Sequence, residues 1–265
     1  MLANGVIEPV CRDPQISNSR ARDQSAYRLT ATIRSESFEP TYLFNLEAVL
    51  SFIERLDVLV TTPIPIGTSE AEHAFPEIAL QRSRHSGGGA MLAEDSWSGK
   101  SRALFIGLAM SCLENQAYCE ATTFNSLFFK YVESFRQRRP FIEITWFLLY
   151  SGLEAHARAN QCDPKSKNSS EPITRLLLSY GLNVLQDNPS DLSRSMSTYM
   201  HLRNALFHRG ERQTEVNVNG TSVKLNMATY LFNLEQLVAL TILKAVDFDD
   251  GHTNWDSWID RQPFI

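Results

Sequence analysis

Cysteine is scarce in this chain. Four cysteines are spread over 265 residues, none forms a CxxC pair, and no histidine lies at zinc-finger spacing from them. Cys112 and Cys119 are seven residues apart, so both can lie on one face of a helix. We therefore expect buried, reduced thiols rather than a metal or redox site.

Long apolar runs and a surplus of positive charge are also missing. No stretch reaches about 18 uncharged apolar residues, so we expect no membrane span. Residues 1–14 lack the basic segment and apolar run of a secretory signal, so we expect a cytoplasmic protein. The net charge is −5, yet residues 100–212 hold 14 Lys and Arg against 10 Asp and Glu. A polyanion would therefore meet this middle part of the chain.

Several catalytic motifs are incomplete or missing. Residues 98–101 read Ser-Gly-Lys-Ser, like the end of a phosphate-binding loop, but Glu94 occupies the place of a glycine that this loop requires. Neither a GxSxG nucleophile elbow nor an HExxH zinc motif is present. We therefore expect no bound metal and no cofactor.

The N-terminal part, residues 1–95, is predicted to be a small mixed α/β region of unknown role. Residues 26–35 are rich in β-formers and partly alternate, which indicates a strand. Residues 41–60 carry apolar side chains at helical spacing. Residues 85–99, with three consecutive glycines, are the best candidate for a linker.

The C-terminal part, residues 96–265, is predicted to be a helical domain, which makes the whole chain mainly α. Residues 214–225 alternate around Asn219-Gly220, and this pattern predicts a β-hairpin. The expected helices cover residues 101–118, 122–137, 140–160, 172–186, 191–209 and 227–246.

One heptapeptide occurs twice. The sequence Thr-Tyr-Leu-Phe-Asn-Leu-Glu fills residues 41–47 and again residues 229–235, and both copies begin amphipathic stretches. Duplication of a helix start and coincidence between two amphipathic helices both explain it, so no function is assigned to it.

The helix expected over residues 191–209 carries the residues with the clearest chemistry. At about 100° per residue, its apolar side chains form one stripe, and His201, Asn204 and His208 form a second stripe roughly opposite. Arg203 lies at the border of the apolar stripe. A solvated polar face is the alternative interpretation of these residues.

These residue types suit RNA cleavage. Attack of a 2′-hydroxyl on the neighbouring phosphorus needs one group that takes a proton and one that gives it, and histidine does both near neutral pH. Charge builds up on the phosphate oxygens, and an arginine fork can neutralise it. His208 would be the acid or base and Arg203 the phosphate ligand, in a scheme that requires no metal.

Arg203-Asn204, followed by three residues and then His208, resembles the motif of the HEPN superfamily. That motif is an arginine, often followed by asparagine, with a histidine a few residues later near the end of a long helix. The resemblance covers about residues 140–246 and implies a helical bundle into which the hairpin is inserted. Gly210 stands where one toxin branch has a tyrosine, so the subfamily stays open.

The resemblance also implies a function and partners. Many HEPN proteins are ribonucleases of toxin–antitoxin or anti-phage systems, and they commonly form dimers in which two motifs face each other. We therefore expect a metal-independent endoribonuclease that leaves a 2′,3′-cyclic phosphate and acts as a homodimer. RNA is the expected substrate, and an antitoxin or other regulatory protein is a candidate partner.

Further site residues are candidates because of their position and charge. Glu154, in the helix expected over residues 140–160, could orient His208 or Arg203, or be an ordinary helix-end charge. The densest basic cluster could contact RNA or be a solvated helix end. Candidate RNA-binding residues are Arg136, Arg138, Arg139, His201 and Arg209.

Two other functions stay open on the sequence alone. The same groove could bind RNA or a nucleotide without cleaving it. The helical part could also be a protein-interaction domain in which the motif is structural.

Overall fold

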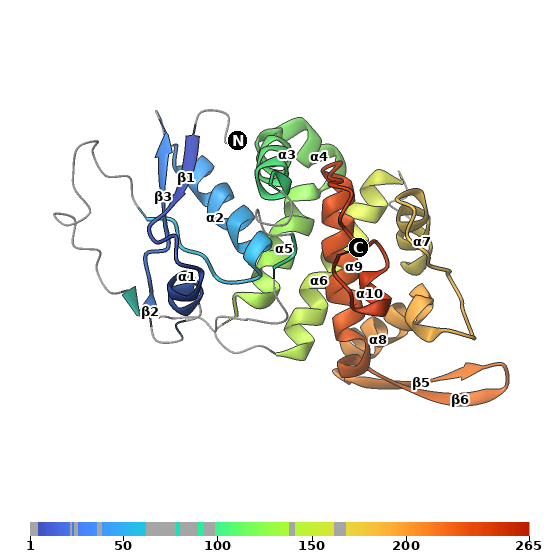
Figure 1. Cartoon of the computed structure of the whole chain (residues 1–265). Helices are drawn as coiled ribbons and strands as arrows, with labels where there is room; N and C mark the ends of the chain where they lie inside the picture. The colour runs from blue at the N-terminus through green and yellow to red at the C-terminus, as the bar shows by residue number, and fades with distance from the viewer. Residues whose placement is uncertain are drawn as a thin grey trace.

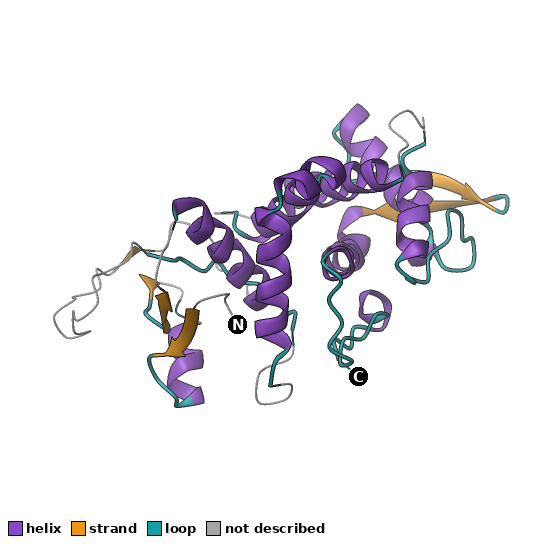
Figure 2. Cartoon of the chain, turned by 90° about the horizontal axis from the view of Figure 1, so that it is seen from above, coloured by secondary structure: helices purple, strands orange, loops and turns teal. Residues whose placement is uncertain are grey.

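Helices form most of the protein, and short strands lie at two ends of it (Figures 1 and 2). The computed structural model describes residues 5–21, 23, 26–35, 39–61, 78–79, 90–92, 99–137, 141–161 and 168–264. The mainly α fold class predicted from the sequence is confirmed. Most of the expected linker, residues 85–99, lies outside the described residues.

The N-terminal part combines short strands with two helices, of which only the second was predicted from the sequence. The strand expected over residues 26–35 is in fact two strands, because its halves pair with different partners. Residues 26–27 pair with residues 78–79, and residues 31–35 pair with residues 5–9, both antiparallel. The second helix has Pro40 at its first position, where no backbone N–H is needed. The elements are β1 (Gly5–Pro9), α1 (Pro14–Ala21), β2 (Ala26–Tyr27), β3 (Ala31–Ser35), α2 (Pro40–Glu54) and β4 (Ile78–Ala79).

The rest of the described chain is helical apart from one hairpin. Asn219 and Gly220 both have positive φ, at 50° and 84°, which gives the hairpin the tight turn predicted for it. The elements are α3 (Ser101–Glu114), α4 (Gln116–Thr122), α5 (Phe124–Phe135), α6 (Ile142–Asn160), α7 (Ser170–Ser179), the 3-10 helix η1 (Leu192–Arg194), α8 (Met196–Arg209), β5 (Gln213–Val218), β6 (Thr221–Asn226), α9 (Met227–Ala245) and α10 (Ser257–Asp260).

Three helix predictions need correction. The helix expected over residues 101–118 is two helices, because Asn115 is extended and its side chain accepts the N–H of Tyr118, which caps α4. The helix expected from residue 172 ends at Ser179, just before Gly181 turns the chain at a φ of 78°. The helix expected over residues 191–209 begins at Met196, because residues 192–194 first form η1.

One hydrophobic core runs through both parts of the chain. Phe52 of α2 stacks on Phe105 of α3 and Phe128 of α5, with ring centroids 4.9 and 5.6 Å apart. Helix α2 therefore lies beside α5 as a member of the bundle (Figure 1). The predicted domain boundary between residues 95 and 96 does not separate two hydrophobic cores. Among the described residues, the buried apolar side chains of α2 belong to the same core as those of the helical bundle.

The two copies of the heptapeptide have the same structural role. They begin α2 and α9, and their second leucines, Leu46 and Leu234, are both buried in the core. Their final glutamates each pair with a buried arginine: Glu47 with Arg136, and Glu235 with Arg55 at 3.6 Å. Burial raises the pKa of Glu235, and Arg55 opposes that rise.

His156 joins α6 to the end of α4. Its ring is buried, and Nδ1 donates to the carbonyl oxygen of Thr122 at 2.7 Å, which leaves Nε2 as an acceptor near the side-chain amide of Asn160. Burial lowers the pKa of His156 from 6.5 to about 4, although the bond to Thr122 opposes the shift. The neutral ring is therefore the form that the fold stabilises.

This histidine makes stability depend on pH. Because the pKa of His156 is lower in the folded state, its contribution is complete above pH 6.5 and is lost as the pH falls towards about 4. We expect the loss to be on the order of 3 kcal/mol in the free energy of unfolding. Urea denaturation at a series of pH values should show a shallower acid decline for His156→Gln than for wild type. An unchanged decline in that variant, with His208→Gln as the exposed control, would contradict this assignment.

Candidate functional site

Helix α8 has the two stripes predicted for it. Tyr199 and Leu202 face the core and are fully buried. His201 and His208 are exposed on the other side, with Asn204 half-buried between them. The helix ends at Gly210, which has a φ of 67° and donates its N–H to the carbonyl of Leu206.

Arg203 is held at three points. One terminal nitrogen lies 3.5 Å from Oε2 of Glu154, and the other donates to Oδ1 of Asn204 at 3.0 Å. The guanidinium also lies over the ring of Phe207, 4.7 Å from its centroid. Since an arginine–carboxylate hydrogen bond is normally about 2.7–2.9 Å, the contact with Glu154 is loose and leaves donors of the guanidinium open to an anion. The side chain is 28% exposed.

Glu154 reaches this site from α6. Its side chain also accepts from Arg158 at 2.9 Å, so one carboxylate lies between two arginines. The structure thus brings Glu154 together with Arg203, one of the two partners foreseen for it. Its bonds to described residues do not include His208.

His208 lies in the last turn of α8, one residue beyond Phe207 and one turn beyond Asn204. Its ring is exposed and makes no hydrogen bond or ion pair with the described part of the chain. Arg203 contacts both Phe207 and Asn204, so its guanidinium is directed towards the end of the helix that carries His208. Arg203 and His208 thus both lie in the last two turns of α8, about 140° apart around the helix.

The other two exposed candidates on this helix differ in their surroundings. Arg209 pairs with Glu211 at 2.6 Å and donates to Thr214 Oγ1 at 3.1 Å, which fixes the start of the hairpin to α8. His201 lies two turns before His208, and partial burial lowers its pKa, an effect that Asp187 opposes.

An apolar patch beside the motif was missed in the sequence. Phe141, Ile144 and Phe147 extend along the start of α6 and are 41–52% exposed. Phe207 of α8 joins them, with its ring centroid 5.4 Å from that of Phe147. The spacing of three residues between these side chains in the sequence already indicates one helix face.

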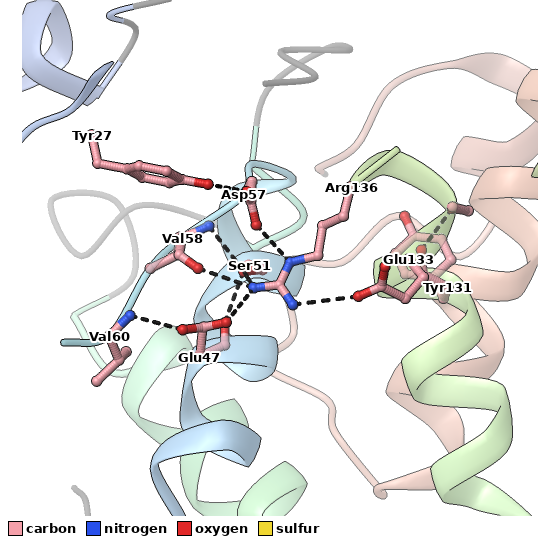
Figure 3. A network of polar contacts seen from close by, with 10 residues as sticks. Tyr27, Glu47, Ser51, Asp57, Val58, Val60, Tyr131, Glu133 and Arg136 are labelled. Atoms are coloured by element: carbon pink, nitrogen blue, oxygen red, sulfur yellow. Dashed lines mark hydrogen bonds and ion pairs between the residues drawn. The ribbon is translucent and has the colours of Figure 1, made fainter. Parts of the chain in front are cut away.

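Arg136 is not an RNA contact, which corrects the sequence prediction. Its side chain is only 4% exposed. As Figure 3 shows, its guanidinium donates to Glu47 Oε1 at 2.8 Å, Ser51 Oγ at 3.2 Å and the carbonyl oxygen of Val58 at 3.0 Å, and it pairs with Asp57 at 2.7 Å. Arg138 and Arg139 lie outside the described residues.

Neighbouring groups complete this buried ion cluster. Tyr27 of β2 donates to the other oxygen of Asp57, and Glu47 accepts the N–H of Val60 at 3.0 Å (Figure 3). Arg136 caps the end of α5, whereas its carboxylate partners belong to α2 and the segment after it. The cluster therefore fixes the N-terminal part to the bundle.

Arg136→Ala should be strongly destabilising. The substitution leaves the buried carboxylate of Asp57 and the partly buried carboxylate of Glu47 without their counter-ion, which typically costs about 3–5 kcal/mol. Chemical denaturation is the measurement. Arg212→Ala is the matched control, because the ion pair of Arg212 with Glu143 is exposed and contributes little. Equal, small effects of the two substitutions would contradict the structural role of Arg136.

Within the described residues, no group of three or more His, Cys, Asp or Glu side chains is arranged to hold a metal ion. None of the helices described has both the length and the apolar character to cross a membrane.

No family model, curated protein or solved structure matches the chain. The residues at the end of α8 and their contacts are therefore the basis for assigning a function.

Proposed function

We propose that the protein is a metal-independent endoribonuclease of the HEPN type, with its site at the end of α8. The observation that carries this proposal is the contact of Arg203 with Glu154 and Asn204 next to an exposed His208. The contact of Arg203 with Glu154 is long, and the arginine side chain is 28% exposed, whereas the side chains of Arg55 and Arg136 are 6% and 4% exposed. The terminal nitrogens of Arg203 are therefore the ones that an anion can reach.

Each residue has one task in the proposed reaction. The 2′-oxygen of the RNA bonds to the adjacent phosphorus while the bond from phosphorus to the 5′-oxygen breaks, which gives a 2′,3′-cyclic phosphate and a 5′-hydroxyl. One proton leaves the 2′-hydroxyl and another is delivered to the 5′-oxygen, and His208 acts in these transfers. Arg203 neutralises charge on the phosphate. Asn204 and Glu154 are positioning residues that orient the guanidinium.

A homodimer would supply the two histidines that the proposed reaction needs. One exposed histidine cannot act as base and acid in the same step, whereas two copies of His208 facing each other can. The apolar patch of Phe141, Ile144, Phe147 and Phe207 lies beside the motif, and exposed patches of this kind mark interaction surfaces. A two-fold axis through this patch would bring the two motifs into one cleft.

Cleavage should depend on His208 and not on a divalent cation. We expect His208→Ala to lower the cleavage rate about 10²–10⁴-fold without loss of folding, since the side chain is exposed. The assay uses labelled single-stranded RNA with and without excess chelator, and the cyclic phosphate is identified by its mobility and its conversion by acid. His252→Ala is the control among the histidines.

Arg203→Lys separates catalysis from structure in the same assay. Lysine keeps a charge near Glu154 but cannot bind a phosphate with a planar fork, so activity should fall while the melting temperature changes little. Wild-type cleavage rates in folded His208→Ala would refute the proposal. RNA binding without any cleavage would favour the non-catalytic binding module.

The dimer is tested at the apolar patch. Wild type should sediment as a dimer at micromolar concentration, and Phe147→Asp should sediment as a folded monomer with reduced cleavage, because a carboxylate would be buried without a partner. Phe44→Asp is a matched control: Phe44 is also exposed and also stacks on a neighbouring ring, that of Phe129, but belongs to α2. A monomeric wild type would contradict this part of the proposal.

A further inference from the structure

A cavity lies between the start of α8 and the hairpin. Its volume is about 270 Å³, and its walls come from the segment before α8, the first turns of α8, and strands β5 and β6. Small-molecule sites usually measure about 300–1,000 Å³, so this one suits a single ring system rather than a larger ligand. The hairpin forms one wall, and it extends from the end of the helix that carries the motif (Figure 1).

Polar groups without protein partners face this cavity. Thr198 is 3% exposed and Ser197 is 8% exposed, and neither hydroxyl has a hydrogen-bond partner within the described residues. Neither oxygen is among the fully buried polar atoms without a partner in the described part of the chain, so both hydroxyls are open to the cavity, where water or a ligand can bond to them. The side-chain amide of Asn217 accepts from Gly220 through its oxygen, which leaves its NH₂ group to donate. Donors and acceptors are thus both available.

The apolar walls and the charge define the ligand further. Leu192, Val216 and Leu225 provide flat apolar surface, and the imidazole of His201 provides a ring on which another ring can stack. Lysine and arginine are missing from the lining, whereas Asp187 is part of it. A carboxylate repels phosphate but accepts hydrogen bonds from amino groups. The cavity therefore suits an uncharged, planar ring that carries polar atoms on its edge.

The cavity and His208 share one helix face. His201 lines the cavity and His208 lies two turns later on the same exposed stripe, about 10 Å along the helix axis. An unpaired RNA strand with its phosphate at His208 would therefore pass the opening of the cavity. Proteins that read single-stranded RNA stack splayed bases on rings, which here His201 can provide, and form hydrogen bonds to the edges of the bases.

We propose that this cavity binds one unpaired nucleobase of the RNA substrate, near the scissile phosphate, and gives the enzyme its base preference. The inference rests on the proposed ribonuclease function for the identity of the strand. The same ring chemistry is present in a free nucleotide, so the experiment includes both sources.

Binding is measured on the full chain with His208→Ala, so that no RNA is cleaved. The probes are short fluorescent homopolymers of A, C, G or U, and the four ribonucleoside monophosphates, all at one salt concentration because phosphate contacts depend on it. We expect one homopolymer to bind more tightly than the others. Adding Thr198→Val should weaken that complex about 3- to 10-fold, the worth of one neutral hydrogen bond. Adding His201→Ala should weaken it at least about fivefold, through loss of stacking.

Controls separate binding from folding. Thr229→Val makes the same chemical change at an exposed position of α9 and should leave the affinities unchanged. Thr198→Val should keep the wild-type melting temperature, because its hydroxyl has no partner in the described structure.

The outcomes distinguish failure of the base-binding inference from failure of the ribonuclease proposal. Equal affinity for all four homopolymers, or wild-type affinity in both Thr198→Val and His201→Ala, overturns the inference even if the protein cleaves RNA. Base-dependent binding that needs Thr198 supports it even if no cleavage is found, in which case the ribonuclease proposal fails alone. Monophosphate binding as tight as RNA binding, and unaffected by Arg203→Ala, overturns the assignment to RNA and identifies a free-nucleotide site.

Discussion

Helix α6 packs against α4, α5, α7, α8 and α9, and the position of α8 depends on this packing. Gly152 allows the close approach to α5, because a Cβ there would lie 3.3 Å from the backbone of Leu127. The buried face of α8, with Tyr199 stacked on Trp146 of α6, then fixes the rotation of α8. With the rotation fixed, Glu154 meets Arg203 and the polar stripe of α8 faces solvent.

The charges of the protein separate into two groups with different tasks. Arg55 and Arg136 are buried, and each pairs with the glutamate of one copy of the heptapeptide, so they stabilise the contact of α2 with α5 and α9. Arg203 lies at the surface, in a loose ion pair with Glu154. A buried ion pair must be complete to be stable, whereas a partly exposed arginine can exchange its partner for a phosphate. This difference makes the end of α8 the best candidate for chemistry.

Local patterns were enough for much of the fold and part of the site. The stripes of α8, the hairpin with its Asn219-Gly220 turn and the extent of α6 follow from spacing and turn chemistry. The helix boundaries near Asn115 and Ser179 did not follow, because one depends on a side-chain cap and the other on the turn that comes after it. The cavity beside His201 could not be foreseen, since its walls come from two segments that meet only in the folded chain.

The sequence by itself determined which residues can perform acid–base and anion-binding chemistry, and that His208 lies on a polar helix face, because a helix period relates near neighbours in the chain. Only the tertiary structure decided which arginines are free to act. Arg136 is buried and donates a hydrogen bond to Glu47, which is 89 residues away in the sequence. Arg203 contacts Glu154 on another helix. Contacts between distant segments depend on how the helices pack, and packing is set by the whole core rather than by any local pattern.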